Sequence, residues 1–178
     1  MKEPMPVVLQ PQAQPQFIMG LIPCLNRAFL DAVWQVIRPG VEELAQRSNG
    51  EFEAYRVWKE VYGGSMHLYM AYADRTGQSV DPKRFQEIFV QKLNTPHQDF
   101  AGFSIVQFLD TSAHVFAVYI MPEFRQSNLW PLGMKFIEDQ IKSIGAPYIS
   151  VSTGSEHRES MVRYGYMENH VTFRKKLK

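Results

Sequence analysis

The stretch that decides the fold is VYIMPEFRQSNLWPLGMKFIEDQIKSIG, residues 118–145. It begins in an apolar strand that is predicted over residues 113–121 and passes through a polar turn into an amphipathic segment. Phe136, Ile137, Ile141 and Ile144 share one face of a helix, and Gly145 is expected to end that helix. This order of strand, turn and helix places backbone N–H groups at a helix N-terminus, where an anion can bind.

Around this stretch the sequence alternates between the two-residue period of strands and the 3.6-residue period of helices. Further strands are predicted at 66–74, 101–109, 147–153 and about 166–175, and the strands at 101–109 and 113–121 form an antiparallel hairpin. Helices are predicted from about residue 29 to 48 with an interruption at Pro39-Gly40, and at 51–62, 82–93 and 156–164.

Composition points to one ordinary globular domain. The chain has 178 residues, of which 45% are hydrophobic and 21% charged, and its formal net charge is +1. A balance so close to neutral does not favour duplex DNA or an anionic membrane as a partner, and only the basic residues within 174–178 support nucleic-acid binding. We expect a protein of the virion or of the host cytoplasm.

The residues that ligate metals or form disulfides are sparse. Cys24 is the only cysteine, so the chain has no internal disulfide and no cysteine-based metal site. The histidines show no metal-binding spacing such as H-x-x-x-H. The apolar run at 17–25 is too short to span a bilayer and follows no basic region, which argues against an anchor or a signal peptide.

The N-terminal residues are expected to form an extended arm. Residues 1–16 contain four prolines and four glutamines (MKEPMPVVLQPQAQPQ), a composition that does not build a core. We therefore assign residues 1–24 to an arm and residues 25–178 to the folded domain. The arm either contacts a protein partner or another copy of the chain, or it packs on its own domain.

Two segments resemble the GNAT family, the acetyl-CoA-dependent N-acyltransferases. The stretch at 118–145 is similar to the family's strand, loop and helix, and MVRYGYMENHVTFRKKL at 161–177 is similar to its closing Gly-aromatic pair and last strand. The resemblance implies an α/β fold with a mixed, mostly antiparallel central sheet flanked by helices. It also implies an insertion at about 75–100, where GNAT proteins have a tight hairpin.

The resemblance assigns residues to the loop that holds the coenzyme A pyrophosphate. If acetyl-CoA binds, its predicted contacts are Arg125, Ser127 and Asn128, with Arg125 at the opening position of the loop. Asn128 stands at the first glycine of the family pattern, and asparagine can keep the turn because it tolerates a left-handed backbone better than most residues. Trp130 stands at the Gly/Ala position, where an indole takes the space of the phosphates or points into the core, and Pro131 removes one N–H donor.

The same comparison predicts no catalytic residue. Met161 stands where the family places its tyrosine general acid, and a thioether cannot donate a proton. Tyr164 lies three residues after Met161. Gly154 stands where the family has an asparagine that binds the coenzyme. His114, His157 and Glu123 are the candidate bases, but packed histidines and a solvated turn residue are the commoner explanation.

Two functions follow from these assignments. The leading hypothesis is a GNAT-like protein with an impaired acyl-CoA site and no cofactor. It would act as a non-catalytic structural or interaction component of a bacteriophage particle, because the C-terminal segment, with His157 eight residues before Gly165, is similar to GNAT-like virion proteins of tailed phages. The alternative is an active acetyl-CoA-dependent N-acetyltransferase that acts on an amine.

Overall fold

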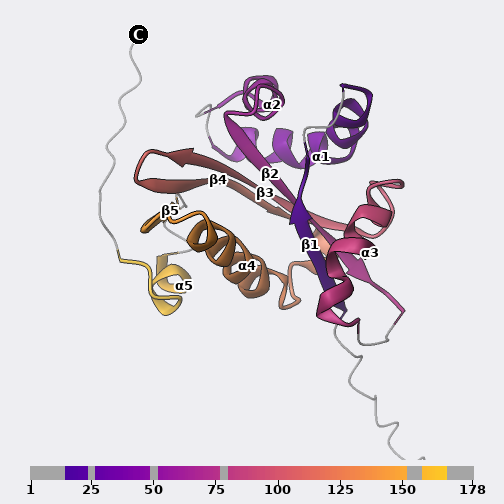
Figure 1. Cartoon of the computed structure of the whole chain (residues 1–178). Helices are drawn as coiled ribbons and strands as arrows, with labels where there is room; N and C mark the ends of the chain where they lie inside the picture. Colours follow the sequence, from indigo (N-terminus) through magenta and orange to yellow (C-terminus); the bar gives the residue numbers. More distant parts are fainter. Residues whose placement is uncertain (1–14, 24–26, 49–51, 77–79, 152–157, 168–178) are drawn as a thin grey trace, which may run out of the picture.

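The computed structural model describes residues 15–23, 27–48, 52–76, 80–151 and 158–167. Its centre is a five-stranded sheet in the order β1-β2-β3-β4-β5, in which all neighbours are antiparallel except β4 and β5 (Figure 1). The strands are β1 (Gln16–Leu21), β2 (Met66–Asp74), β3 (Phe100–Leu109), β4 (Ser112–Ile120) and β5 (Tyr148–Val151). The helices are α1 (Arg27–Arg47), α2 (Ala54–Tyr62), α3 (Phe85–Lys92), α4 (Leu129–Ser143) and α5 (Arg158–Arg163), with 3-10 turns η1 (Pro82–Arg84) and η2 (Pro122–Phe124). The predicted class, a mostly antiparallel sheet flanked by helices, is confirmed.

Helices cover both faces of the sheet. Helices α1 and α2 lie on one side and α4 on the other (Figure 1). The first face buries Ile37 of α1 and Phe89 of α3 against the strands, and both side chains are fully buried. The second face packs Ile137 and Ile141 of α4 against Val115 of β4. Each helix thus buries one apolar stripe, which is the main source of its stability.

The predicted boundary of the arm is wrong, because residues 16–21 form β1. This strand pairs antiparallel with β2, from Gln16 opposite Asp74 to Leu21 opposite Tyr69. Its neighbouring side chains Phe17 and Ile18 point to opposite faces, and both are buried. Residues 16–21, which were assigned to the arm, therefore belong to the sheet. Residues 1–14 lie outside the described part of the chain.

The predicted interruption at Pro39-Gly40 is also wrong, because α1 continues through both residues. Proline costs a helix one hydrogen bond. Here the surrounding turn is held against the sheet, since Ile37 and Val41 are buried. A Cβ added to Gly40 would lie 2.7 Å from the Tyr119 ring, so the helix backbone approaches the strand too closely for any side chain at this position.

The other predicted elements are found with small shifts of their ends. The strand at 66–74 is β2, and the two predicted hairpin strands are β3 and β4. The glycine expected to end the central helix, Gly145, has φ of +82° and lies two residues after Ser143, the last residue of α4. The insertion at 75–100 contains η1 and α3, and α3 packs on β1. The last predicted strand falls mainly on residues 168–178, outside the described residues.

Candidate functional site

The two parallel strands β4 and β5 share a short contact within the described residues. They pair only from Ser112 opposite Tyr148 to Val115 opposite Val151. Phe116 is an extra residue in β4, because Val106 pairs with Val115 while Ile105 pairs with Ala117. Among the described residues, the second half of β4 therefore has a strand partner on its β3 side only. This half leads directly into the loop before α4.

The first turn of α4 offers few backbone donors to an anion. The N–H of Leu129, the first helical residue, donates to the Ser127 hydroxyl at 3.2 Å. The third helical residue is Pro131, which has no N–H. Among the described residues, the N–H of Trp130 is thus the single donor left in the first three positions of the helix. An anion-binding helix terminus normally directs several such groups at its ligand.

The structure brings the three predicted coenzyme contacts to this turn, but two of them are already engaged. Arg125 donates from Nη2 to Glu43 of α1 at 3.0 Å and from Nε to the Ile120 carbonyl at 3.1 Å. The Ser127 hydroxyl donates to the Phe124 carbonyl at 2.6 Å. Asn128 is the residue before α4, and its φ of −82° shows that its backbone is not left-handed. Whether these three residues contact a coenzyme stays a prediction.

Glu43 is a residue that the sequence did not indicate, and it collects three donors. Its carboxylate accepts hydrogen bonds from the Tyr119 hydroxyl at 2.8 Å and from Arg125, and it pairs with Arg47. The hydrogen bond from Tyr119, together with the two arginines, lowers the pKa of Glu43 below its ordinary value of 4.5. Burial and the neighbouring Glu43 carboxylate raise the pKa of Tyr119. This cluster ties α1 to the loop before α4.

The Glu43 cluster should make stability depend on pH. A carboxyl whose pKa is depressed by folding stabilises the protein above its unfolded pKa, and this contribution is lost as pH falls through the folded pKa. We therefore expect Glu43→Gln to lower the midpoint of thermal unfolding near neutral pH. The difference from wild type should shrink as pH falls below about 4.5. Thermal scans by circular dichroism at several pH values measure it.

Glu42→Gln is the matched control for this prediction. Glu42 precedes Glu43 on α1 and forms an exposed ion pair with Arg38 at 2.7 Å. Exposed pairs on a helix contribute little, so this variant should follow wild type at every pH. A Glu43→Gln deficit that stays constant down to pH 3 would contradict the assigned role of the carboxylate.

Trp130 lies on the sheet side of α4. It is half-buried and lines a pocket together with Val118 and Ile120 of β4. This arrangement agrees with the second of the two orientations expected from the sequence, in which the indole points toward the core. The indole therefore occupies space between the helix and the second half of β4.

The candidate acid and bases do not form a cluster. Met161, at the position of the family's general acid, is buried on α5, and Tyr164 is exposed. His114 Nδ1 lies 2.9 Å from the Ser150 hydroxyl across the β4–β5 contact, and burial lowers the pKa of this histidine. Glu123 accepts from Arg75 at 3.0 Å, which agrees with a surface role.

The described residues contain neither a metal-binding cluster nor a membrane-spanning helix. Within the described ranges, no group of three His, Cys, Asp or Glu side chains could hold a metal ion. No helix in those ranges is long and apolar enough to cross a membrane. Gly154 and His157 fall outside the described residues, as does Cys24.

Comparison with solved structures identifies the fold. A ribosomal-protein-alanine N-acetyltransferase from Brucella melitensis biovar Abortus 2308 matches with a TM-score of 0.60 at 10% identity, over 92% of this chain and 100% of that chain. An aminoglycoside acetyltransferase from an uncultured soil metagenomic sample, in complex with sisomicin, matches with 0.59 at 10% identity, over 91% and 97%. This is the GNAT fold.

A third acetyltransferase structure is also similar, but the sequence comparisons find no match. Glucosamine-6-phosphate N-acetyltransferase from Arabidopsis thaliana also matches, with a TM-score of 0.55 at 13% identity, over 92% of this chain and 99% of that chain. No protein-family model and no curated protein sequence matches the chain. At such low identity the likeness shows the GNAT fold alone, so the function must be argued from the residues of the site.

Proposed function

We propose that this protein has an impaired acyl-CoA site and acts as a non-catalytic structural or interaction component of a bacteriophage particle. The observation that carries the proposal is the first turn of α4. The Leu129 N–H donates to the Ser127 hydroxyl, and Pro131 has no N–H. Among the described residues, the N–H groups of Asn128 and Trp130 are thus the two donors left at this terminus. A diphosphate would meet too few donors at this terminus.

The charges around the loop support the same conclusion. Arg125 stands at the opening position of the family's loop, and its guanidinium donates to the carboxylate of Glu43. A coenzyme phosphate would have to displace the Glu43 carboxylate before it could bind the Arg125 guanidinium. The residues present therefore do not fit coenzyme A.

The position of the general acid also supports a non-catalytic role. Met161 is 7% exposed and has only a thioether sulfur to offer. Loss of a general acid typically lowers a rate by about 10²–10⁴-fold. Combined with a weak cofactor site, this loss makes acetyl transfer slow even at high coenzyme concentration.

The proposed place in a phage particle depends on the similarity of the C-terminal segment to GNAT-like virion proteins. Binding to a protein partner, or to another copy of the chain, is assigned to the N-terminal arm, now limited to residues 1–15. Light scattering of the full chain and of a chain without residues 1–14 tests this assignment. Assembly or partner binding should require the arm.

An active N-acetyltransferase is the competing function, and one observation favours it. Within the described residues, the second half of β4 has no strand partner on the side of β5. Its backbone N–H and C=O groups on that side are available to a bound substrate. The release of free thiol from acetyl-CoA in the presence of primary amines decides between the two functions. We expect release at the rate of a blank without protein, and turnover that saturates with amine would establish the competing function.

A further inference from the structure

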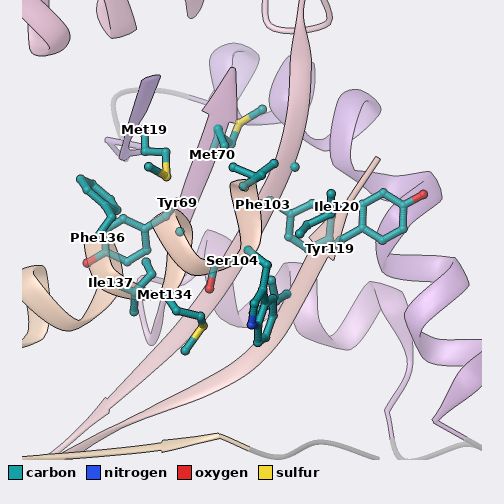
Figure 2. Close-up of a pocket in the computed structure, with 16 residues that line it drawn as sticks. Met19, Tyr69, Met70, Phe103, Ser104, Tyr119, Ile120, Met134, Phe136 and Ile137 are labelled. Carbon is teal, nitrogen blue, oxygen red and sulfur yellow. The ribbon is translucent and has the colours of Figure 1, made fainter. Parts of the chain in front are cut away.

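A small cavity lies beneath α4, between this helix and strands β1 to β4 (Figure 2). Its volume is about 40 Å³. Three of its lining side chains are methionines, namely Met19, Met70 and Met134, and aromatic and aliphatic groups make up most of the rest. Methionine adapts its shape readily, so such a cavity can fit a guest without strain.

Ser104 contributes a polar group that has no partner. The residue is 8% exposed, and its hydroxyl makes no hydrogen bond among the described residues. Figure 2 shows this side chain directed into the cavity from β3. A buried hydroxyl without a partner is costly and rare, so the cavity is expected to hold a group that bonds to it.

Gly133 keeps space open on the helix side of the cavity. It lies inside α4, where glycine is less favourable than alanine. A Cβ added there would meet no atom within 4 Å, and its φ is not positive, so neither crowding nor backbone conformation requires glycine. The unused space beside Gly133 is therefore a second, independent sign that the cavity accepts a guest.

Water suits only part of this cavity, because most of its lining is apolar. A buried water usually makes about three hydrogen bonds, and a site needs two to four polar partners to hold it. Besides Ser104, the lining residues with polar side-chain atoms are Tyr69, Trp130 and Tyr119, and the Tyr119 hydroxyl already donates to Glu43. A guest that is apolar except for one oxygen would satisfy the hydroxyl and also fill the apolar space.

We propose that the cavity beneath α4 binds a small uncharged group of roughly three to five non-hydrogen atoms that carries one hydrogen-bonding oxygen, as a short-chain alcohol does. The size follows from the cavity volume of about 40 Å³, because one water needs roughly 10–15 Å³ of the same measure. The half-buried residues Trp130, Gly133 and Val118 form the side through which the guest enters.

The test uses 1-propanol as a probe and xenon as an apolar probe without a hydrogen-bonding atom. Titration of the full chain, followed by heteronuclear NMR, should shift resonances of α4 and β3 with a millimolar dissociation constant for 1-propanol. Ser104→Ala should weaken 1-propanol binding by about 10-fold, because one hydrogen bond is lost, and should leave xenon binding unchanged. Gly133→Leu should abolish binding of both probes.

Leu132→Ala is the matched control, because Leu132 neighbours Gly133 on α4 but does not line the cavity. It should bind both probes as wild type does. Equal propanol affinity in wild type and Ser104→Ala would overturn the proposal, as would resonance shifts that persist unchanged in Gly133→Leu. Failure of Gly133→Leu to fold leaves the Ser104 comparison decisive. Since no coenzyme is used, the outcome is independent of the proposed function.

Discussion

Replacing Gly102 by alanine is expected to destabilise the protein by about 3 kcal/mol. Gly102 lies on β3 opposite Ile120, and an added Cβ would sit 2.3 Å from the carbonyl oxygen of Tyr119. A backbone atom cannot move aside as the end of a flexible side chain can, so β3 and β4 must separate locally. Thermal unfolding should show a midpoint lower by roughly 6–12 °C.

Gly133→Ala is the matched control for this effect. It is the same substitution in the same sheet–helix layer, but the new Cβ meets no atom within 4 Å. Alanine is the better helix former, so the variant should be more stable than wild type by up to about 1 kcal/mol. Two alanine variants with shifts of the same sign and size would contradict the packing described here.

The second large effect concerns the loop before α4. The double variant Ser127→Ala and Pro131→Ala should raise the affinity for coenzyme A by about 100-fold. The first change frees the Leu129 N–H, which now donates to the Ser127 hydroxyl, and the second adds an N–H at the third helical position. Each donor adds a charge-assisted hydrogen bond, worth about 10-fold or more. Because wild type is expected to show no saturable heat up to millimolar coenzyme A, the gain should be seen in isothermal titration as a saturable isotherm for the double variant alone.

Two further variants separate the causes of this gain. Ser143→Ala removes a hydroxyl at the opposite end of α4, where it donates to the Gln140 carbonyl, and should leave coenzyme affinity as in wild type. Trp130→Gly tests steric blocking, and we expect little gain because the indole lines the cavity on the sheet side. If Trp130→Gly alone restores affinity while the double variant does not, blocking by the indole is the cause.

Elements with strong local patterns were predictable from the sequence. Helix α4 has one apolar stripe and a terminal glycine, and the β3–β4 hairpin joins two apolar strands by a short turn. Both signals lie within a few residues of the element they describe. The GNAT resemblance drew on the same stretch, which is why the fold class was correct.

Elements that depend on distant partners were missed. Strand β1 follows a Pro/Gln-rich stretch, and its partner β2 begins about 50 residues later, so no local signal announced the pairing. Helix α1 passes through Pro39 because the sheet holds the turn around it, which the sequence does not reveal. In both cases tertiary packing decided between structures that local preference left open.

The candidate site shows the same limit. The sequence indicated Arg125 as a loop residue and the missing N–H donor at Pro131, because both follow from the residue type alone. It did not indicate Glu43, which lies 82 residues from Arg125 and meets it only in the folded chain. Nor did it show that the Leu129 N–H donates to the Ser127 hydroxyl, since that hydrogen bond depends on the backbone of the turn.

The most direct test of the impaired site is the binding of coenzyme A to the unmodified protein. Isothermal titration of the full chain with coenzyme A up to millimolar concentration, near neutral pH and at low salt, gives the answer in one experiment. We predict no saturable heat across this range. A saturable isotherm with a micromolar dissociation constant would contradict the account, because the two donors left at the terminus of α4 and an occupied arginine could not provide it.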